Sequence, residues 1–399
     1  MRKTCPDISS TDNSCKVRSD RRRIVLWGTF DLGKPRVRIM RDALFRRFEV
    51  TEIGCDIWGT TRDKSQVSRL RMAARTLQTF LAWPGLVIRY LRVPTHDAVV
   101  VGYFGLFDVL AIAIPARLRG VPVIWDAFLS VYDTVVEDRA MVARGKTVAR
   151  MLHALEKLAC RAANIVVLDT RAHAHYFEAE YRLPRGKTAS VMVGCEGVFA
   201  ASSSDCDGVS NRPVVLFYGQ FIPLHGIGTI VEAACLRGAE RFDWRIIGTG
   251  QEAAFIAALI AAARPENLQW TEWVEYEQLA KEIARADVCL GVFGTSAKAG
   301  RVIPNKVFQI LASGKPLVTR DGPGMRELMP EDHPSVKLVP AGNPEALLNA
   351  VEEMLQSIGA HEVLPDDRIG DRFARDVIEQ GWADVIEQAI RTHSAGVLL

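Results

Sequence analysis

One short stretch of the chain, Phe293–Arg320, places three of its cations at the beginning of a predicted helix. Lys298, Arg301 and Lys306 lie just before or at the start of a helix that Pro304 is expected to open. The N-terminal end of a helix already carries a partial positive charge, so cations are unfavourable there unless an anion lies among them. A phosphate is the commonest such anion. The stretch therefore predicts phosphate binding, with a solvated basic loop as the alternative.

Glycine loops follow three predicted strands in the second half of the chain. They contain Gly219 and Gly226, Gly248 and Gly250, and Gly294. Glycine at a strand end lets backbone N–H groups approach a ligand closely. We expect all three loops at one edge of a single sheet, beside the basic helix start.

The sequence motifs of several other classes of protein are missing. No G-x-G-x-x-G follows the first strand of either half, and no G-x-x-x-x-G-K-[ST] is present, which disfavours a dehydrogenase and a P-loop NTPase. H-E-x-x-H, G-x-S-x-G and C-x-x-C are also missing, and no metal site is predicted. His173 and His175 are better explained by a surface helix than by metal ligation.

The elements that must position these residues alternate between strand and helix, twice over. A small polar stretch, residues 200–212, separates the two series and is the best linker. This pattern predicts two doubly wound parallel α/β domains. In the first half we expect strands at 24–27, 48–53, 98–103, 121–125, 165–168 and 190–193, with helices at 38–47, 64–93, 106–118 and 142–161. In the second we expect strands at 214–218, 244–247, 268–270, 288–292 and 317–319, with helices at 227–236, 252–263, 276–285 and from 304.

The resulting division has five parts. Residues 1–20 are expected to be a disordered tail, residues 21–199 and 213–372 the two domains, and residues 373–399 a last helical segment. Asp126 directly follows a strand, at the sheet edge where ligands of open α/β sheets gather.

The helical stretch 64–93 combines an apolar stripe with flanking arginines. Pro84 and Gly85 are expected to break it. Such a stretch fits a helix on an anionic membrane surface, and equally a domain helix with a solvated basic face. The longest apolar run, 98–116, is divided by Asp108 and is better explained as strand plus helix than as a membrane span.

The net charge of +3 over 399 residues conceals an asymmetry. Residues 1–200 carry a net charge of +12, and residues 201–399 carry −9. A basic half suits anionic lipid or acidic substrates, and no nucleic-acid partner is expected. The N-terminus has no apolar core typical of a secretory signal, and the eight cysteines form no C-x-x-C pair. We therefore expect a cytoplasmic protein, peripheral on the inner face of the membrane if the 64–93 stretch binds lipid.

The second half resembles the donor domain of family 4-type glycosyltransferases with the GT-B fold. The resemblance rests on five segments in order, VVLFYGQFIPLHGIGTIVEAA, WRIIGTGQE, ADVCLGVFG, RVIPNKVFQILASGKPLV and MRE, over residues 214–328. It implies two Rossmann-like domains facing across a cleft, the first for the acceptor and the second for a nucleotide-diphosphate sugar. It also implies that the last helix returns to the first domain, and that retaining transfer needs no metal and no cofactor beyond the donor.

The chain departs from the family pattern at its charged positions. The Glu-x7-Glu motif falls on Arg301 and Gln309, and the Arg and Lys that hold the diphosphate fall on Gln220 and His225. The first-domain position that is often His falls near Asp126. The resemblance therefore implies relocated phosphate binding, through Lys298, Arg301 and Lys306.

An active transferase acting on a membrane-linked or cell-surface glycan is the leading hypothesis. Under the resemblance, Asp126 is the catalytic group, and Gln309 binds the ribose. The remaining donor contacts are expected from Gly28, Gly219, Gln220, His225, Gly226, Gly248, Gly250 and Val274, together with the three cations. A non-catalytic nucleotide-binding or partner protein is the alternative. A sugar-nucleotide epimerase is less favoured, because no convincing set of acid and base groups can be assembled.

Overall fold

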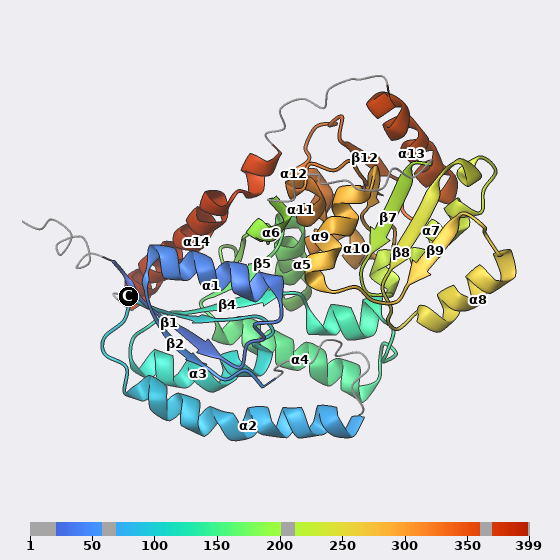
Figure 1. The fold of residues 1–399 in the computed structure, drawn as a ribbon. Helices are drawn as coiled ribbons and strands as arrows, with labels where there is room; N and C mark the ends of the chain where they lie inside the picture. Colours follow the sequence, from blue (N-terminus) through green and yellow to red (C-terminus); the bar gives the residue numbers. More distant parts are fainter. Residues whose placement is uncertain (1–20, 58–68, 201–211, 360–368, 398–399) are drawn as a thin grey trace, which may run out of the picture.

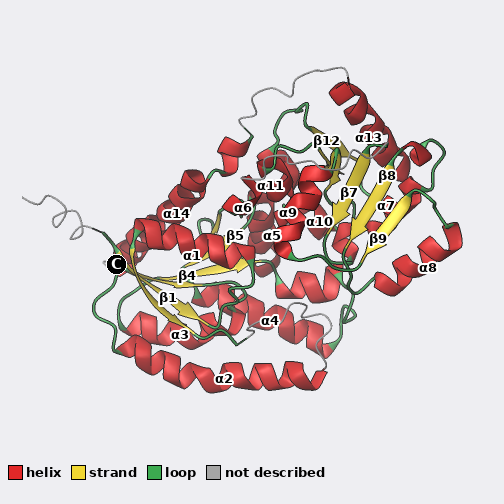
Figure 2. Cartoon of the chain, in the orientation of Figure 1, coloured by secondary structure: helices red, strands yellow, loops and turns green. Residues whose placement is uncertain are grey.

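The computed structural model describes residues 21–57, 69–200, 212–359 and 369–397. The expected tail 1–20 and most of the expected linker lie outside these residues. Figure 1 shows two α/β domains side by side, and Figure 2 shows that each is built around its own sheet.

The N-terminal sheet has six strands in the order β2-β1-β3-β4-β5-β6, and every neighbouring pair is parallel. β3 has the sequence AVVV and is buried throughout, as expected of a strand covered on both faces. The strands are β1 (Arg23–Gly28), β2 (Glu49–Gly54), β3 (Ala98–Val101), β4 (Val123–Phe128), β5 (Ile165–Leu168) and β6 (Thr188–Ser190). The α-helices are α1 (Pro35–Arg47), α2 (Arg69–Leu91), α3 (Leu106–Leu118), α4 (Thr147–Ala162), α5 (Arg171–Tyr181) and α6 (Gly197–Ala200).

The C-terminal sheet repeats this plan, in the order β12-β11-β10-β7-β8-β9 and again parallel. Its strands are β7 (Val214–Tyr218), β8 (Asp243–Ile247), β9 (Leu268–Thr271), β10 (Val288–Leu290), β11 (Leu317–Arg320) and β12 (Val336–Val339). The α-helices that follow β7 are α7 (Ile227–Ala234), α8 (Ala253–Ala263), α9 (Tyr276–Arg285), α10 (Ala297–Arg301), α11 (Asn305–Ala312), α12 (Pro323–Leu328), α13 (Pro344–Gly359) and α14 (Arg375–Val397). The predicted fold class, two doubly wound parallel α/β domains, is confirmed.

Three local expectations were wrong. The helix expected at 64–93 is not broken at Pro84, because α2 runs from Arg69 to Leu91 through it. Pro84 is exposed, so water can satisfy the carbonyl that loses its N–H partner. The strand expected at 190–193 ends at Ser190. A six-residue π-helix, Asp133–Asp138, lies where no regular element was expected.

The last helix, α14, packs against the N-terminal domain. Ile378 and Trp382 share an apolar cluster with Val37 and Met40 of α1. Figure 1 shows α14 lying along α1 on this side of the first sheet. The last described helix therefore returns to the domain that contains β1.

A buried ion pair between α1 and β4 stabilises this packing. Arg36 of α1 donates to Asp126 of β4 from Nη2 at 2.8 Å and from Nε at 3.0 Å, with the two side chains 2% and 0% exposed. Arg36 also donates to the carbonyl of Val191 at 2.6 Å. Its guanidinium lies 5.4 Å from the ring of Phe128 and 5.1 Å from that of Trp382. One arginine thus joins α1, β4, the segment after β6, and α14.

This environment changes the interpretation of Asp126, which the sequence predicts as the catalytic group. Its carboxylate is enclosed, and both oxygens accept hydrogen bonds from Arg36. Burial raises the pKa of Asp126, and the charge of Arg36 opposes that shift. In this arrangement the Asp126 carboxylate is buried and used by Arg36, so we propose a positioning role for it.

The substitution Asp126→Asn tests that role. It leaves the charge of Arg36 buried without a carboxylate, so the free energy of unfolding should fall by about 3–5 kcal/mol. Urea denaturation measures the loss, and adding Arg36→Met should recover part of it. The control is Asp321→Asn, which breaks the exposed pair with Arg326 and should cost about 1 kcal/mol or less. A stable Asp126→Asn variant without activity would instead restore the catalytic assignment.

Candidate functional site

The glycine loops after β7 and β8 meet at the carboxyl ends of these strands. Gly219 N donates to the carbonyl of Ile247 at 2.9 Å, and Phe221 N donates to that of Thr249 at 2.9 Å. The backbones are so close that a Cβ on Gly248 would lie 1.9 Å from Gly219 O. Gly248 also has a φ of +145°, a conformation that other residues rarely adopt. The expected meeting of these loops at one sheet edge is confirmed.

The loop after β10 joins them. A Cβ on Gly226 would lie 2.5 Å from Gly294 N, and Gly294 N donates to the carbonyl of Leu224 at 3.2 Å. Gly226 also precedes α7 in the left-handed conformation, with a φ of 63°. The backbones at the carboxyl ends of β7, β8 and β10 therefore lie close together at one edge of the sheet.

A pocket of about 220 Å³ opens beside these loops. Its wall is mainly apolar, with the half-exposed ring of Trp273 at the surface. Trp270 Nε1 donates to Gly248 O at 2.8 Å and so stabilises the loop that lines the pocket. Such a pocket suits a flat ring system, but it is smaller than the roughly 300–1,000 Å³ usual for a whole ligand. The lining residues are Tyr218, Gly219, Gln220, Ile247, Gly248, Thr249, Glu272, Trp273, Val274, Tyr276 and Leu279.

Gln309 lies behind this pocket with both ends of its amide occupied. Its Oε1 accepts from the Tyr218 hydroxyl at 3.1 Å, and its Nε2 donates to the Tyr276 hydroxyl at 3.2 Å. Tyr276 in turn donates to Glu196, which pairs with Arg38 of α1 at 2.7 Å. No motif in the sequence indicates this series of hydrogen bonds, because Tyr276 and Glu196 lie in segments that are far apart.

Lys306 lies beside Gly219, which lines the pocket, and its amine has no hydrogen-bond partner among the described residues. The side chain is 5% exposed, and Nζ finds no hydrogen-bond partner among the described residues. Nζ lies 3.7 Å from the ring centroid of Phe217, and a Cβ on Gly219 would lie 2.9 Å from it. Burial holds the pKa of Lys306 well below its usual value. A buried cation without a partner indicates a place for an anion.

His225 flanks the same place. Its Nδ1 contacts the carbonyl of Gln220, which can only accept, so Nδ1 carries the proton. Burial, and then the charge of Lys306, hold the pKa of His225 well below its usual value. His225 is therefore neutral at pH 7. The side chain of Gln220 itself is exposed at the rim of the pocket.

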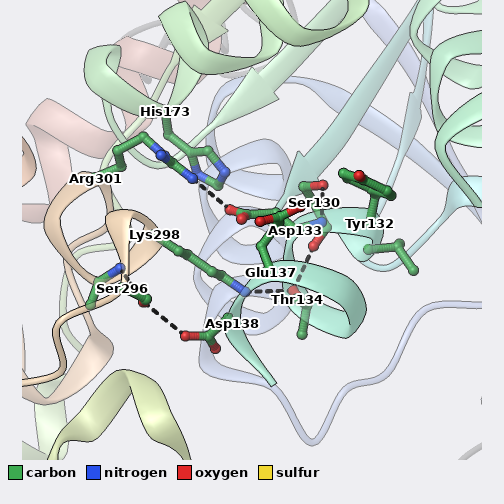
Figure 3. Close-up of polar contacts among 12 residues, drawn as sticks. Ser130, Tyr132, Asp133, Thr134, Glu137, Asp138, His173, Ser296, Lys298 and Arg301 are labelled. Carbon is green, nitrogen blue, oxygen red and sulfur yellow. Dashed lines mark hydrogen bonds and ion pairs between the residues drawn. The ribbon is translucent and has the colours of Figure 1, made fainter. Parts of the chain in front are cut away.

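Lys298 and Arg301 face the other domain instead. Arg301 Nη2 lies 2.9 Å from Asp133 Oδ2, and Lys298 Nζ donates to Thr134 Oγ1. Ser296 Oγ donates to Asp138 at 2.9 Å. Figure 3 shows these contacts, in which α10 lies against the π-helix of the first domain. The two cations predicted to bind phosphate are thus held by N-terminal groups in this arrangement, and Lys306 alone of the three is left unpaired.

Further contacts bind the same loop to the first domain. Ile303 N donates to Asp169 Oδ2 at 3.2 Å, and the Arg301 carbonyl accepts from Thr170 Oγ1. Glu327 of α12 accepts from the backbone N–H groups of Arg171 and Ala172, at the N-terminal end of α5. A carboxylate is favourable there because a helix N-terminus is partially positive.

Gly28 is the last residue of β1 and lies against Asp108 of α3. Asp108 Oδ2 accepts from Thr29 N at 2.8 Å, and a Cβ on Gly28 would lie 2.8 Å from this oxygen. Asp108 Oδ1 also accepts from Trp83 Nε1 of α2 at 2.7 Å. The nearest neighbours of Gly28 thus belong to the N-terminal domain.

Comparison with known families supports the interpretation of the second domain. Residues 212–357 match the family described as Glycosyl transferases group 1. The C-terminal domain is a group 1 glycosyltransferase domain. Searching the curated protein sequences finds no match to the chain.

Solved structures of low sequence identity share the whole two-domain fold. HepE from Anabaena, solved in complex with UDP, has a TM-score of 0.65 at 14% identity and covers 92% of this chain and 99% of its own. Sucrose-phosphate synthase from Thermosynechococcus elongatus has a TM-score of 0.60 at 16% identity, covering 95% and 100%. A glycosyltransferase from Rickettsia africae has 0.58 at 11%, covering 94% and 97%. The chain therefore has the GT-B fold.

The described residues offer no candidates for two other kinds of site. No group of three or more His, Cys, Asp or Glu side chains there is placed to hold a metal ion. None of the described helices combines the length and the apolar sequence that a membrane crossing requires.

The unpaired amine of Lys306 predicts an unusual effect on stability. Lys306→Met should raise the free energy of unfolding of the ligand-free protein at pH 7 by about 1–3 kcal/mol, because it removes a buried unsatisfied donor. Since the folded pKa lies below the unfolded one, the unfolded chain binds more protons between these values. The gain should therefore shrink as the pH rises toward the unfolded pKa of about 10.4.

Urea denaturation between pH 7 and pH 10 measures this difference. Lys337→Met is the matched control, because Lys337 is exposed and paired with Glu353, and it should change little. A loss of stability in Lys306→Met at every pH would show that the amine has a partner within the protein.

Proposed function

We propose that this protein transfers a sugar from a nucleotide-diphosphate sugar to an acceptor in the cleft between its domains. The observation that carries the proposal is the amine of Lys306, which is buried without a hydrogen-bond partner beside Gly219, a residue that lines an apolar pocket. It provides a cation where the phosphates of a nucleotide would leave the pocket. The group 1 glycosyltransferase match over residues 212–357 supports the same function.

In this proposal the donor lies along the carboxyl ends of β7 and β8. The base stacks in the pocket near Trp273 and Val274, and the ribose hydroxyls lie toward Gln309 and Tyr276. The diphosphate lies over Gly219, Lys306 and neutral His225. HepE, which shares the fold, was solved with UDP and with UDP-glucose, and this supports a UDP-sugar as the donor.

Transfer then depends on stabilising the departing diphosphate. The bond between the anomeric carbon and the β-phosphate oxygen breaks, and a bond from that carbon to an acceptor hydroxyl oxygen forms. The hydroxyl proton passes to the departing phosphate oxygen, on the face that a retaining transfer uses. Fixed cations and backbone N–H groups can stabilise the developing charge in place of a metal.

Lys298 and Arg301 take a different part from the one that the sequence suggested. Their contacts with Thr134 and Asp133 hold the donor domain against the π-helix. We propose that they close the cleft and border the sugar, while Lys306 binds phosphate. Their charges are largely balanced by Asp133 and Asp138, so they add little free positive charge.

The outer face of the N-terminal domain suggests that the acceptor is membrane-linked. The solvent side of α2 is apolar, because Leu77, Leu81, Ile88 and Leu91 are all more than half or about half exposed, and Leu81 reaches 70%. Its opposite side is buried through Leu86 and other core residues. A helix that is apolar on both sides needs a second apolar partner.

The charge around this face fits an anionic lipid surface. Residues 69–93 contain five arginines and no acidic residue. Leu118, 82% exposed on the neighbouring α3, and Arg117 extend the face. Figure 1 shows α2 along the outside of the domain, with α3 beside it. We therefore propose peripheral binding to an anionic membrane and a lipid-linked or cell-surface glycan as acceptor.

A nucleotide-binding protein without turnover is the second candidate. It is favoured by Asp126, which is enclosed by Arg36, and by Gln309, whose amide is already used by two tyrosines. Detecting sugar transfer, or slow hydrolysis of a nucleotide sugar that is lost in Lys306→Met, would exclude it.

A donor screen by thermal shift tests the main proposal. UDP-, GDP- and ADP-sugars should be compared, and the true donor at about 100 times its Kd should stabilise the protein by about 2.7 kcal/mol. EDTA should leave the shift unchanged if no metal takes part. Lys306→Met should lose the shift, and Lys337→Met should keep it. If no nucleotide sugar, and no nucleoside diphosphate, shifts the unfolding temperature, the proposal fails.

Sedimentation with vesicles tests the membrane face. Wild-type protein should bind vesicles containing about one third phosphatidylglycerol and release them as salt rises. Leu81→Glu should weaken binding on the order of tenfold or more, since burying a leucine contributes about 1.5–3 kcal/mol. The control is Phe255→Glu, which changes an exposed apolar residue of α8 in the other domain. Equal binding of Leu81→Glu and wild type would remove α2 from the interface.

A further inference from the structure

Arg139, at the end of the π-helix, is a second cation whose side chain has no hydrogen-bond partner among the described residues. Its Nε is buried without a hydrogen-bond partner, and none of its other side-chain nitrogens donates to a described residue in a contact that the structure shows. The neighbouring carboxylate, Asp138, is used by Ser296 Oγ across the cleft. The side-chain N–H groups of Arg139 are therefore available to bind a ligand.

The backbone of Arg139 is fixed against the donor loop of the opposite domain. Arg139 ends the π-helix, and its N–H donates to the carbonyl of Thr134 at 3.0 Å. Its own carbonyl accepts from Gln251 Nε2 at 3.1 Å. Gln251 directly follows Gly250 in the loop beside the pocket. The residue therefore spans the gap between the first domain and the glycine loops.

Its charge acts on the groups around the phosphate site. The positive charge of Arg139 contributes to the lowered pKa of His225 and of Lys298, after the larger effect of burial on each. His225 lies beside Gly219 and Lys306. Like charges that gather in one partly buried place repel one another, and an anion among them removes this cost.

We propose that Arg139 binds the donor diphosphate from the N-terminal domain, opposite Lys306. This assignment rests on the proposed function and adds a residue from the other side of the cleft. A guanidinium can form two parallel hydrogen bonds to phosphate oxygens, which an ammonium cannot. The diphosphate is then gripped by both domains.

The assignment has a consequence for selectivity. Arg139 reaches the diphosphate only when the π-helix lies against the donor domain, so diphosphate binding and domain closure favour each other. A nucleoside monophosphate occupies the pocket, but its single phosphate does not reach Arg139. Arg139 should therefore distinguish diphosphates from monophosphates, whichever base the pocket prefers.

Calorimetric titration of Arg139→Met with nucleotides tests the proposal. UDP, GDP and ADP should each be compared with the corresponding monophosphate on the full-length protein. For the base that binds, Arg139→Met should weaken diphosphate binding about 10- to 100-fold and monophosphate binding less than about twofold. Arg139→Lys should recover part of the loss, because it keeps the charge without the fork. The unfolding temperature without ligand should stay the same or rise.

The matched control is Arg144→Met. Arg144 is exposed and already paired with Glu137 of the same π-helix, so neither affinity should change. Equal weakening of diphosphate and monophosphate binding, or unchanged diphosphate binding, would overturn the assignment of Arg139. If wild type binds no nucleoside diphosphate at all, the proposed function fails and this inference fails with it.

Discussion

The contact between the π-helix Asp133–Asp138 and the loop that carries Arg301 sets the distance between the two halves of the cleft. Arg301 pairs with Asp133, and Ser296 binds Asp138. Around them, backbone groups of Ile303 and the first turn of α5 find partners on the opposite domain. Charged and polar contacts of this kind are exchangeable with water, unlike an apolar core. They can therefore hold two domains together and still let them separate for substrate exchange.

The cations of the cleft fall into two groups with different energetics. Lys298 and Arg301 have partners in the protein, so their charges are balanced before any ligand arrives. The side chains of Lys306 and Arg139 make no hydrogen bond or ion pair among the described residues, and each has a buried nitrogen without a partner. Arg301 Nε is also without a partner, but Arg301 Nη2 is paired with Asp133. Such groups destabilise the free protein, and they persist where a bound ligand offsets their cost. In the proposed function, this difference in pairing separates the residues that close the cleft from those that bind the donor.

The sequence predicts the parts of this site that depend on local geometry. Each glycine at a strand end, and the helix start at Lys306, belongs to a single strand–loop–helix unit. The spacing of apolar residues in the sequence predicts where these units lie. The partners of Arg301 and Asp126 could not be found in this way. Asp133 lies 168 residues from Arg301, and Arg36 lies 90 residues from Asp126, so only the folded chain brings them together.

The π-helix explains much of what the sequence analysis missed. Its residues, DTVVED, carry no helical apolar stripe, and its hydrogen bonds give a wider turn than the α-helical pattern describes. Yet this one element supplies Asp133 and Asp138 to domain closure and ends at Arg139. This rare backbone geometry directs three residues toward the opposite domain: Asp133 pairs with Arg301, Asp138 accepts from Ser296, and Arg139 is proposed to bind phosphate. Any motion that separates the domains must move all of them together, so closure and donor binding depend on the same short segment.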